Sequence, residues 1–517
     1  MYSAVSKGAK KDLSVFTRDG ERVIRTRLAT GSVCPAVLAA LCALLLLVAH
    51  PALAQTESVL TSFTGTPDGA SPTSRLTLRN GNLYGTTKTG GAYGNGSVFE
   101  LSPSGNGKWT ETLLYSFCPA APSCTDGQNP TYSYLTFDSA GNMYGTAYAG
   151  GSTGNGVVFE LSPSGNTWTE TVLYSFANSP DGANPINGLI MDTAGNLYGT
   201  TYAGGAAGGN GTVFEMSQSN GIWTEQPLFS INSNGSGLTM DSTGNIYGTT
   251  FSSAYELISN GKGGFNFATI FSFNPANAKT QGSNPMGTLA FDGSGNLWGT
   301  TLAGGTNGYG VLYKLVKGTT GWSQSVLGSF SAHTGENPYA GVVFDKTGNI
   351  FGTTSYGGFY GGGTIYELTK SGKTYSPRIV FPFNGEDGGE PLASLIVDSA
   401  GYLYGTTVIG GTTGNGTVFE VNPHPSLSTT TLTSTPNPST FGQTVTFTAT
   451  VTSTGGTPAD GDIVVFEPIG QAPTVNGVAT YSYSALNVGT TKVTAVFQGD
   501  LNFVKSRSNT ISQVVNP

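Results

Sequence analysis

Short runs of alternating apolar and polar residues follow one another along most of this chain, and Gly, Asn or Ser separates each run from the next. The stretch from Gly188 to Ser230 shows the pattern, because four such runs lie within it. Strands are expected there at 188–192, 197–203, 212–216 and 222–230. Strands of this length joined by short turns predict a four-stranded antiparallel meander.

The second strand of this meander belongs to a heptapeptide, Gly-Asn-Leu-Tyr-Gly-Thr-Thr at Gly81–Thr87, which returns six more times. The later copies begin at Gly141, Gly195, Gly244, Gly295, Gly348 and Gly401, at spacings of 60, 54, 49, 51, 53 and 53 residues. Four-stranded meanders repeated at this period predict a β-propeller, in which each sheet packs on its neighbours around an axis. The repetition marks the heptapeptide as scaffold.

The two ends of the repeat region predict how the propeller closes. Fourth strands carry an apolar-aromatic-Ser-Phe signature such as Leu114–Phe117, and a close relative, Leu60–Phe63, precedes the first heptapeptide. The last repeat runs only through its third strand, Thr417–Val421. The N-terminal segment is therefore expected to supply the fourth strand of the last blade. Such a closure removes an exposed edge and gives seven blades.

The motif order supports two resemblances. The sequence G-N-L-Y-G-T-T, then G-G-x-x-G-N-G-T-V-F-E-L and L-Y-S-F, resembles the GloVer-type tandem repeat of exported bacterial proteins over residues 59–421. The Thr-rich tail resembles a bacterial Ig-like repeat, through Thr429–Thr433, Pro436–Pro438, Gly442–Ala449 and Phe497–Phe503. These resemblances imply export, and for the tail a spacer or adhesive module at the cell surface. Neither brings a known catalytic residue with it.

The whole chain is therefore expected to be all-β, with four parts. These are a signal peptide at 1–54, a seven-bladed β-propeller at 55–421, a linker at 422–428 and an Ig-like β-sandwich at 429–517. Short alternating strands at 430–434, 444–452, 462–468, 477–484 and 491–498 suit such a sandwich. The high content of Gly, 77 of 517 residues, fits an all-β protein that is rich in turns.

The first 54 residues have the features of a Sec-type signal peptide. A basic segment precedes the apolar run Cys34–Val48, and Ala52-Leu53-Ala54 forms a small-x-small cleavage site before Gln55. An uncleaved membrane anchor is the alternative, but the run is short for a spanning helix. We therefore expect a protein that is secreted or held at the cell surface, without membrane insertion after cleavage.

The charge and the cysteine content of the chain limit the kinds of partner and metal site that can be expected. The leader holds seven of the 22 basic and three of the 30 acidic residues, so the remainder carries a formal net charge of −12. An acidic chain without a basic cluster argues against nucleic acid or an anionic membrane as partner. Cys118 and Cys124 are the only cysteines left, and a disulfide is expected between them. No metal site is predicted, because neither has further Cys or His ligands nearby.

Tyrosines mark the candidate binding surface. The glycine-rich loops between strands two and three and the Asp-Gly-x-x-Pro segments between blades leave the same face of a propeller and form one rim. Aromatic rings among small residues suit stacking on sugar rings or contact with a protein, although the same rings also suit packing between blades. The candidate ligand-binding residues are Tyr93, Tyr132, Tyr148, Tyr202, Tyr309, Tyr356 and Tyr360, with Tyr339 beside them.

Carboxylates recur along the repeats as well. An Asp stands three residues before six of the seven heptapeptides, and a Glu lies in the third strand of every blade except the fifth, which has Lys314. Repetition in nearly every blade favours turn-capping and structural roles over calcium binding or glycosidic acid/base chemistry. No catalytic residue and no cofactor is predicted.

Three hypotheses about function follow. The first is a secreted or cell-surface binding and adhesion protein, non-catalytic, whose rim recognises an extracellular polysaccharide or a surface protein and whose Ig-like module acts as a spacer. The second is an extracellular polysaccharide hydrolase or lyase with its site at the propeller centre. It requires non-repeated carboxylates at one end of the channel, with the candidates Asp126, Asp181, Glu336, Asp387 and Glu390. The third is a structural protein of a surface layer or matrix.

Overall fold

The structure is a computed structural model that describes residues 16–18, 21–23, 57–105, 107–165, 167–206, 209–231, 235–372 and 374–517. The chain divides into two compact units, residues 1–54 and residues 55–517. In the first unit, β1 (Phe16–Arg18) pairs antiparallel with β2 (Glu21–Val23). The signal peptide expected at 1–54 otherwise lies outside the described residues. None of the helices in the described part of the chain is long and apolar enough to cross a membrane.

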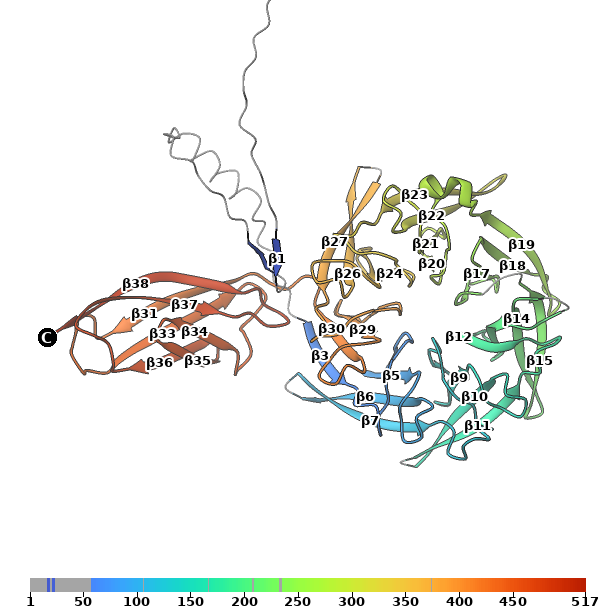
Figure 1. Cartoon of the computed structure of the whole chain (residues 1–517), viewed down its shortest axis with the longest axis horizontal. Coiled ribbons are helices and arrows are strands. Elements are labelled where there is room, and N and C mark those ends of the chain that lie inside the picture. The colour runs from blue at the N-terminus through green and yellow to red at the C-terminus, as the bar shows by residue number, and fades with distance from the viewer. Residues whose placement is uncertain are drawn as a thin grey trace, which may run out of the picture. The chain divides into compact units, whose positions relative to one another are not determined.

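Seven four-stranded antiparallel sheets stand around a central axis (Figure 1). The first sheet consists of β4 (Thr77–Arg79), β5 (Asn82–Thr87), β6 (Ser97–Gly105) and β7 (Lys108–Ser116). The second and third consist of β8 (Thr136–Phe137), β9 (Met143–Ala147), β10 (Val157–Ser164), β11 (Thr167–Ser175), β12 (Ala183–Met191), β13 (Leu197–Ala203), β14 (Thr212–Ser219) and β15 (Ile222–Ser230). The fourth and fifth consist of β16 (Thr239–Met240), β17 (Ile246–Thr249), β18 (Ser253–Ser259), β19 (Phe265–Ser272), β20 (Ala290–Phe291), β21 (Leu297–Thr301), β22 (Val311–Gly318) and β23 (Gly321–Ser329). The sixth consists of β24 (Val343–Phe344), β25 (Ile350–Thr354), β26 (Thr364–Ser371) and β27 (Thr374–Pro382). The predicted seven-bladed propeller is confirmed.

The seventh blade closes the ring with a strand from the other end of the repeat region. Its strand order is β28 (Ile396–Val397), β29 (Leu403–Thr407), β30 (Thr417–Val421) and β3 (Glu57–Ser62). β3 pairs antiparallel with β30, placing Ser58 opposite Glu420 and Ser62 opposite Thr417. The predicted closure by the N-terminal strand is confirmed.

The inner glycine of the heptapeptide makes room for an aromatic ring. Gly85 on β5 lies opposite Phe99 on β6, and a Cβ added at Gly85 would stand 2.5 Å from the tip of the Phe99 ring. Phe159 and Phe214 stand in the same relation to the glycines of blades two and three. A glycine inside a strand normally weakens it, but here it permits a close approach that fills the space between blades. The heptapeptide is therefore a packing element as well as a turn.

In blades four to six a tyrosine replaces this phenylalanine. Tyr255, Tyr313 and Tyr366 are completely buried, and the hydroxyl of each has no hydrogen-bond partner. Because a buried polar group without a partner costs free energy, Tyr313→Phe is expected to raise the free energy of unfolding by about 1 kcal/mol. Thermal or urea denaturation measures the change. Tyr247→Phe is the matched control and should lower stability, since the Tyr247 hydroxyl contacts two carboxylates. A stability loss in Tyr313→Phe would contradict the prediction.

The recurring Asp, Tyr and Glu contact one another in blades three, four and seven. In blade three the Tyr198 hydroxyl lies 3.1 Å from Asp192 and 2.9 Å from Glu215, and Asp192 also accepts a hydrogen bond from the backbone N–H of Asn196. In blade five Trp298 takes the place of the tyrosine and donates to Asp292, which also forms a 2.8 Å ion pair with Lys314. Lys314 therefore stands in place of the third-strand glutamate in the same blade in which Trp298 stands in place of the tyrosine. These residues hold the turns and strands together.

The C-terminal region forms a second all-β body. Its strands are joined in the order β31 (Ser428–Thr435), β33 (Val445–Ser453), β36 (Val478–Tyr483), β35 (Gly470–Val475), β34 (Ile463–Glu467), β37 (Gly489–Phe497), β38 (Ser506–Asn516) and β32 (Ser439–Thr440). Side chains from different strands, among them Phe447, Phe466 and Phe497, meet in one hydrophobic core. The described helical segments are η1 (Pro275–Asn277) and α2 (Ala278–Gln281), between blades four and five.

Candidate functional site

The innermost strands of the seven blades surround a channel that contains three cavities in succession. The funnel, of about 770 Å³, is lined by side chains of these strands, among them Ile190, Val343 and Ile396. The waist, of about 50 Å³, shares Arg75 and Tyr134 with the funnel. The mouth, of about 530 Å³, shares Tyr132 and Tyr339 with the waist. The shared residues show that the three cavities follow one another along the axis.

Four of the rim tyrosines converge on the mouth: Tyr132, Tyr148, Tyr202 and Tyr339. The rings of Tyr132 and Tyr339 stack at 5.5 Å between centroids, although they come from the second and sixth blades. The rings of Tyr148 and Tyr202 lie 6.3 Å apart. Burial, followed by the neighbouring Tyr339 and then Tyr356, raises the pKa of Tyr132 above its usual value. The Tyr132 phenol is therefore a neutral hydrogen-bonding group at ordinary pH.

An inserted residue brings Tyr132 to the axis. Three residues separate Pro72 from Leu76 in the first inter-blade loop, whereas four separate Pro130 from Leu135 in the second. Tyr132 adopts a φ of 56°, a left-handed conformation that is costly for a bulky side chain. Its N–H donates to Thr73 Oγ1 at 3.1 Å, and its carbonyl accepts from the N–H of Tyr134. The surrounding structure thus holds Tyr132 in a strained backbone conformation. Strained residues of this kind are common at binding sites.

The remaining lining of the mouth comes from positions where the repeats differ. The residue directly after each Gly-Thr-Thr or its variant points to the mouth in five blades, as Lys88, Tyr148, Tyr202, Phe251 and Leu302. The residue before it is buried in every blade and is Thr except for Ala147 in the second blade. Sequence reasoning did not single out Lys88 or Leu302. The signal was available, because this position varies immediately beside a nearly constant one.

The other candidate tyrosines do not line the mouth. Tyr93 is 51% exposed and Tyr360 is 67% exposed, both in glycine-rich loops. Tyr309 packs against the hydrophobic cluster between blades five and six. Tyr356 is exposed over much of its side chain. The burial of the remainder, followed by the charge and the hydrogen bond of Glu390, raises the pKa of Tyr356.

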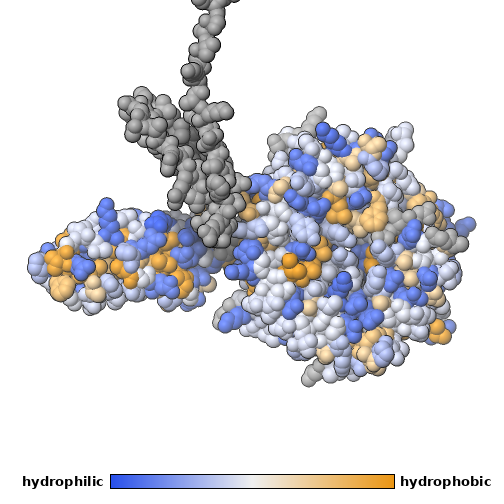
Figure 2. All heavy atoms as spheres, viewed as in Figure 1, coloured by the Kyte–Doolittle hydropathy of each residue, from blue (hydrophilic) through white to orange (hydrophobic). Residues whose placement is uncertain are grey.

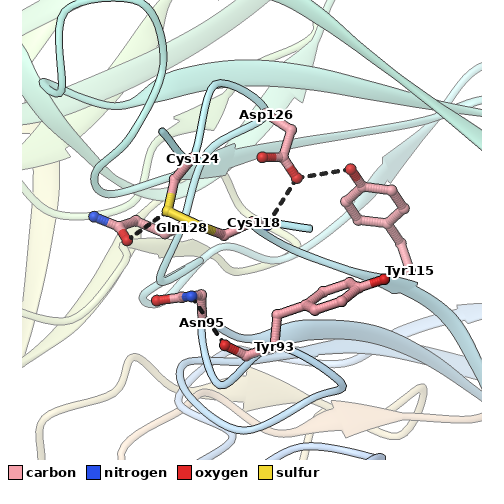
Figure 3. The surroundings of a disulfide bond; sticks show 7 residues. All are labelled: Tyr93, Asn95, Tyr115, Cys118, Cys124, Asp126 and Gln128. Atoms are coloured by element: carbon pink, nitrogen blue, oxygen red, sulfur yellow. Dashed lines mark hydrogen bonds between the residues drawn. A yellow bond between two sulfur atoms is a disulfide. The ribbon is translucent and has the colours of Figure 1, made fainter. Parts of the chain in front are cut away.

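A disulfide joins Cys118 and Cys124 beside the rim (Figure 3). Asp126 supports this loop by accepting hydrogen bonds from the Tyr115 hydroxyl at 2.7 Å and from the N–H of Cys118 at 2.8 Å. The glycine loop that carries Tyr93 lies next to it, with the Asn95 side chain bonded to the Tyr93 carbonyl (Figure 3). The disulfide therefore belongs to the outer part of the rim.

The carboxylates that a hydrolase would require do not meet in the channel. Asp126, Asp181 and Asp387 each accept a backbone N–H bond within their own loop. Neither these nor Glu336 and Glu390 lie among the described residues that line the mouth, the waist or the funnel. Across the described ranges, no group of three or more His, Cys, Asp or Glu side chains is placed to hold a metal ion.

The face of the propeller seen in Figure 2 is mostly of intermediate to hydrophilic character. Figure 2 shows pale residues over most of the face in view, with hydrophobic ones in small scattered groups. Small groups of this kind are ordinary on a protein surface and indicate no large docking patch on that face. The mouth thus stands out by its shape and its aromatic lining.

Comparison with protein families decides the identity of the repeats. The model of the Gloeobacter/Verrucomicrobia repeat matches residues 107–281 and 258–464. The chain belongs to this repeat family. The Gloeobacter/Verrucomicrobia repeat protein also matches the bacterial Ig-like domain (group 3) over residues 432–516. Both resemblances noted in the sequence are therefore confirmed.

Three solved structures match this repeat protein at low sequence identity and with TM-scores below 0.5. A streptogramin B lyase structure is 16% identical with a TM-score of 0.44, covering 71% of this chain and 96% of its own. The extracellular domain assigned to a one-component system of B. thetaiotaomicron is 12% identical with a TM-score of 0.47, covering 90% of this chain and 58% of its own. A protein assigned as a 6-phosphogluconolactonase from Bacteroides uniformis is 15% identical with a TM-score of 0.42, covering 63% and 88%. No curated protein matches the chain.

Proposed function

We propose that this repeat protein is an exported, non-catalytic binding protein whose mouth recognises sugar rings of an extracellular polysaccharide. The Ig-like module serves as a spacer in this proposal. The observation that carries it is the convergence of Tyr132, Tyr148, Tyr202 and Tyr339 on one cavity of about 530 Å³. This volume lies within the range of roughly 300–1,000 Å³ that is usual for ligand pockets.

The chemistry of the mouth suits a neutral sugar. Aromatic faces attract the C–H faces of a pyranose ring, and the tyrosine hydroxyls are placed to bond its hydroxyl groups. Asn129 and Thr131 add further polar groups, and Lys88 is the one charged side chain among the described residues that line the mouth. The stacked pair Tyr132 and Tyr339 forms the floor of the mouth, so a ring can enter from the rim side only as far as this pair.

Variants of the mouth tyrosines test the proposal. Tyr202→Ala and Tyr132→Ala are expected to weaken binding of a polysaccharide found on a glycan array by about 10- to 100-fold, because aromatic anchors at a site centre carry much of the binding energy. Tyr202 is 42% exposed, so its removal should leave the fold intact. Isothermal titration calorimetry with an oligosaccharide of the array hit measures the change.

Tyr93→Ala and Tyr360→Ala are the matched controls, because both rings are exposed in rim loops outside the mouth. Affinity should be unchanged in these two. An equal loss in the controls would move the site to the outer rim. A wild-type protein that binds nothing on an array of bacterial, plant and host glycans would refute sugar recognition.

A further inference from the structure

Arg75 places a positive charge inside the channel without a counter-charge. Its guanidinium carbon lies 4.2 Å from the centroid of the Tyr134 ring, and its Nε atom is buried without a hydrogen-bond partner. Among the described residues that line the waist and the funnel there is no Asp or Glu. The position is unique to the first blade, because the corresponding residues of the other blades are neutral: Tyr134, Gly188, Gly237, Thr288, Gly341 and Ser394.

A guanidinium in this setting needs an acceptor. Arginine keeps its charge at all ordinary pH values and offers five N–H donors in one plane. The stack on Tyr134 uses the face of that plane and leaves the donors at its edge for another group. Arg75 is partly exposed, and a charge that is partly withdrawn from water without a partner is destabilised, so an anion that enters the waist is stabilised there. The hydroxyls of Thr288 and Ser394, which also line the waist, can add hydrogen bonds.

The size of the neighbouring cavities defines the rest of the ligand. The waist, at about 50 Å³, has room for a carboxylate but for little more. The contiguous funnel has about 770 Å³ and presents the apolar side chains Ile190, Val343 and Ile396. We propose that the channel binds a small organic acid, with its carboxylate on Arg75 in the waist and an apolar body in the funnel. This site lies on the far side of the Tyr132–Tyr339 pair from the mouth and does not depend on sugar binding there.

Arg79 provides a matched comparison within the same blade. Its guanidinium also stacks on an aromatic ring, 4.4 Å from the centroid of Phe137, but Arg79 lines neither the waist nor the funnel. A purely structural role of arginine–aromatic stacking predicts similar consequences for both residues. Anion binding in the channel predicts consequences for Arg75 alone.

The experiment measures binding of a series of alkanoates to the full chain by isothermal titration calorimetry. Affinity is expected to rise from acetate through butyrate to hexanoate, by about 4-fold for each methylene group buried in the funnel. Hexanamide, which has the same body without the charge, should bind at least 10-fold more weakly than hexanoate. This pair of ligands tests the proposal on the unaltered protein, so the result does not depend on how a variant folds.

Arg75→Met is expected to weaken hexanoate binding by about 10- to 100-fold, because a charge-assisted bidentate contact is lost. The affinity of Arg75→Lys for hexanoate should lie between those of the wild type and Arg75→Met, and Arg79→Met should bind hexanoate like the wild type. Equal affinity for hexanoate and hexanamide, equal loss in Arg79→Met, or no binding by the wild type would each overturn the proposal. So would an Arg75-dependent effect of chloride without one of hexanoate, since the site would then hold a simple halide.

Discussion

A chain that begins at Thr64, and therefore lacks β3, is expected to lose most of its resistance to unfolding. The seventh blade would end at β30 with an unpaired edge. Phe63 would also be missing. Its ring is completely buried and lies edge-on to the ring of Phe99 in the first blade, with 5.1 Å between the ring centroids. Loss of a buried phenylalanine side chain alone costs about 3–5 kcal/mol, and the strand pairing is lost in addition.

The contacts of this segment explain why the loss should spread beyond one blade. The N–H of Phe63 donates to the Gly416 carbonyl at 3.0 Å, and its carbonyl accepts from the Thr413 hydroxyl. Thr61 donates to Glu111 of the first blade at 2.7 Å. β3 therefore joins the last blade to the first, and its removal opens a ring whose blades each depend on two neighbours.

Urea denaturation and hydrogen exchange of the β30 amides measure the effect. A synthetic peptide of residues 55–65 is expected to restore part of the stability in trans, and the same peptide with Phe63→Ala should restore less. A chain lacking β3 with an unchanged denaturation midpoint and protected β30 amides would show that the closure contributes little. Phe63→Ala in the full chain provides the intermediate case.

The architecture was predictable because it rests on local, repeated signals. The spacing of the heptapeptides gives the blades, and the early Leu60–Phe63 signature gives the closing strand. Each of these depends on a residue and its near neighbours in the chain. The C-terminal Ig-like body was likewise marked by its own motifs and by the end of the repeats.

The functional cavities were only partly predictable, because they depend on which blades face one another across the axis. Tyr132 and Tyr339 were both recognised as rim residues, but no sequence signal shows that their rings stack. Arg75 was not singled out, since a lone arginine in a loop is ordinary until the channel is seen around it. Lys314 departs from the repeated third-strand glutamate, and the structure pairs it with Asp292 beside Trp298.

A second large effect is expected from pH, because half-buried acid pairs lie at four seams between blades. Each pair joins a glutamate of an outer strand to the aspartate of an Asp-Gly loop. The pairs are Glu57 with Asp387, Glu111 with Asp68, Glu170 with Asp126, and Glu225 with Asp181. In all four glutamates one carboxyl oxygen is buried without a hydrogen-bond partner. Like charges in such a setting oppose ionisation.

Burial, and next the neighbouring aspartate, raises the pKa of Glu57 to about 9 and those of Glu170 and Glu225 to about 8. In the unfolded chain these carboxyl groups have their ordinary pKa of about 4.5. The folded protein therefore holds protons that the unfolded chain releases, and stability falls as pH rises from about 4.5 towards the folded values. The protein should be more stable at pH 5 than at pH 9, the opposite of what ion-paired carboxylates would give.

Glu170→Gln isolates one seam. The amide cannot ionise, so we expect the variant to be about 1–2 kcal/mol more stable than the wild type at pH 9, a figure that allows for solvent screening of a partly exposed carboxyl. At pH 5 the two should differ little. Blade five already contains neutral residues at both positions, because Gln324 replaces the glutamate and Gln281 replaces the aspartate. The side-chain amide of Gln324 donates a hydrogen bond to the backbone carbonyl of Gln281 at 2.8 Å.

Urea denaturation at pH 5, 7 and 9 provides the measurement. Glu160→Gln is the control in the same blade, because this third-strand glutamate faces no Asp-Gly loop and accepts a hydrogen bond from Ser162. The control should keep the pH dependence of the wild type, whereas Glu170→Gln should reduce it, with the share of Glu57 and Glu225 remaining. A wild type that gains stability between pH 5 and pH 9 would mean that the seam glutamates are ionised in the folded protein. In that case water or a cation would have to reach carboxyl oxygens that are buried.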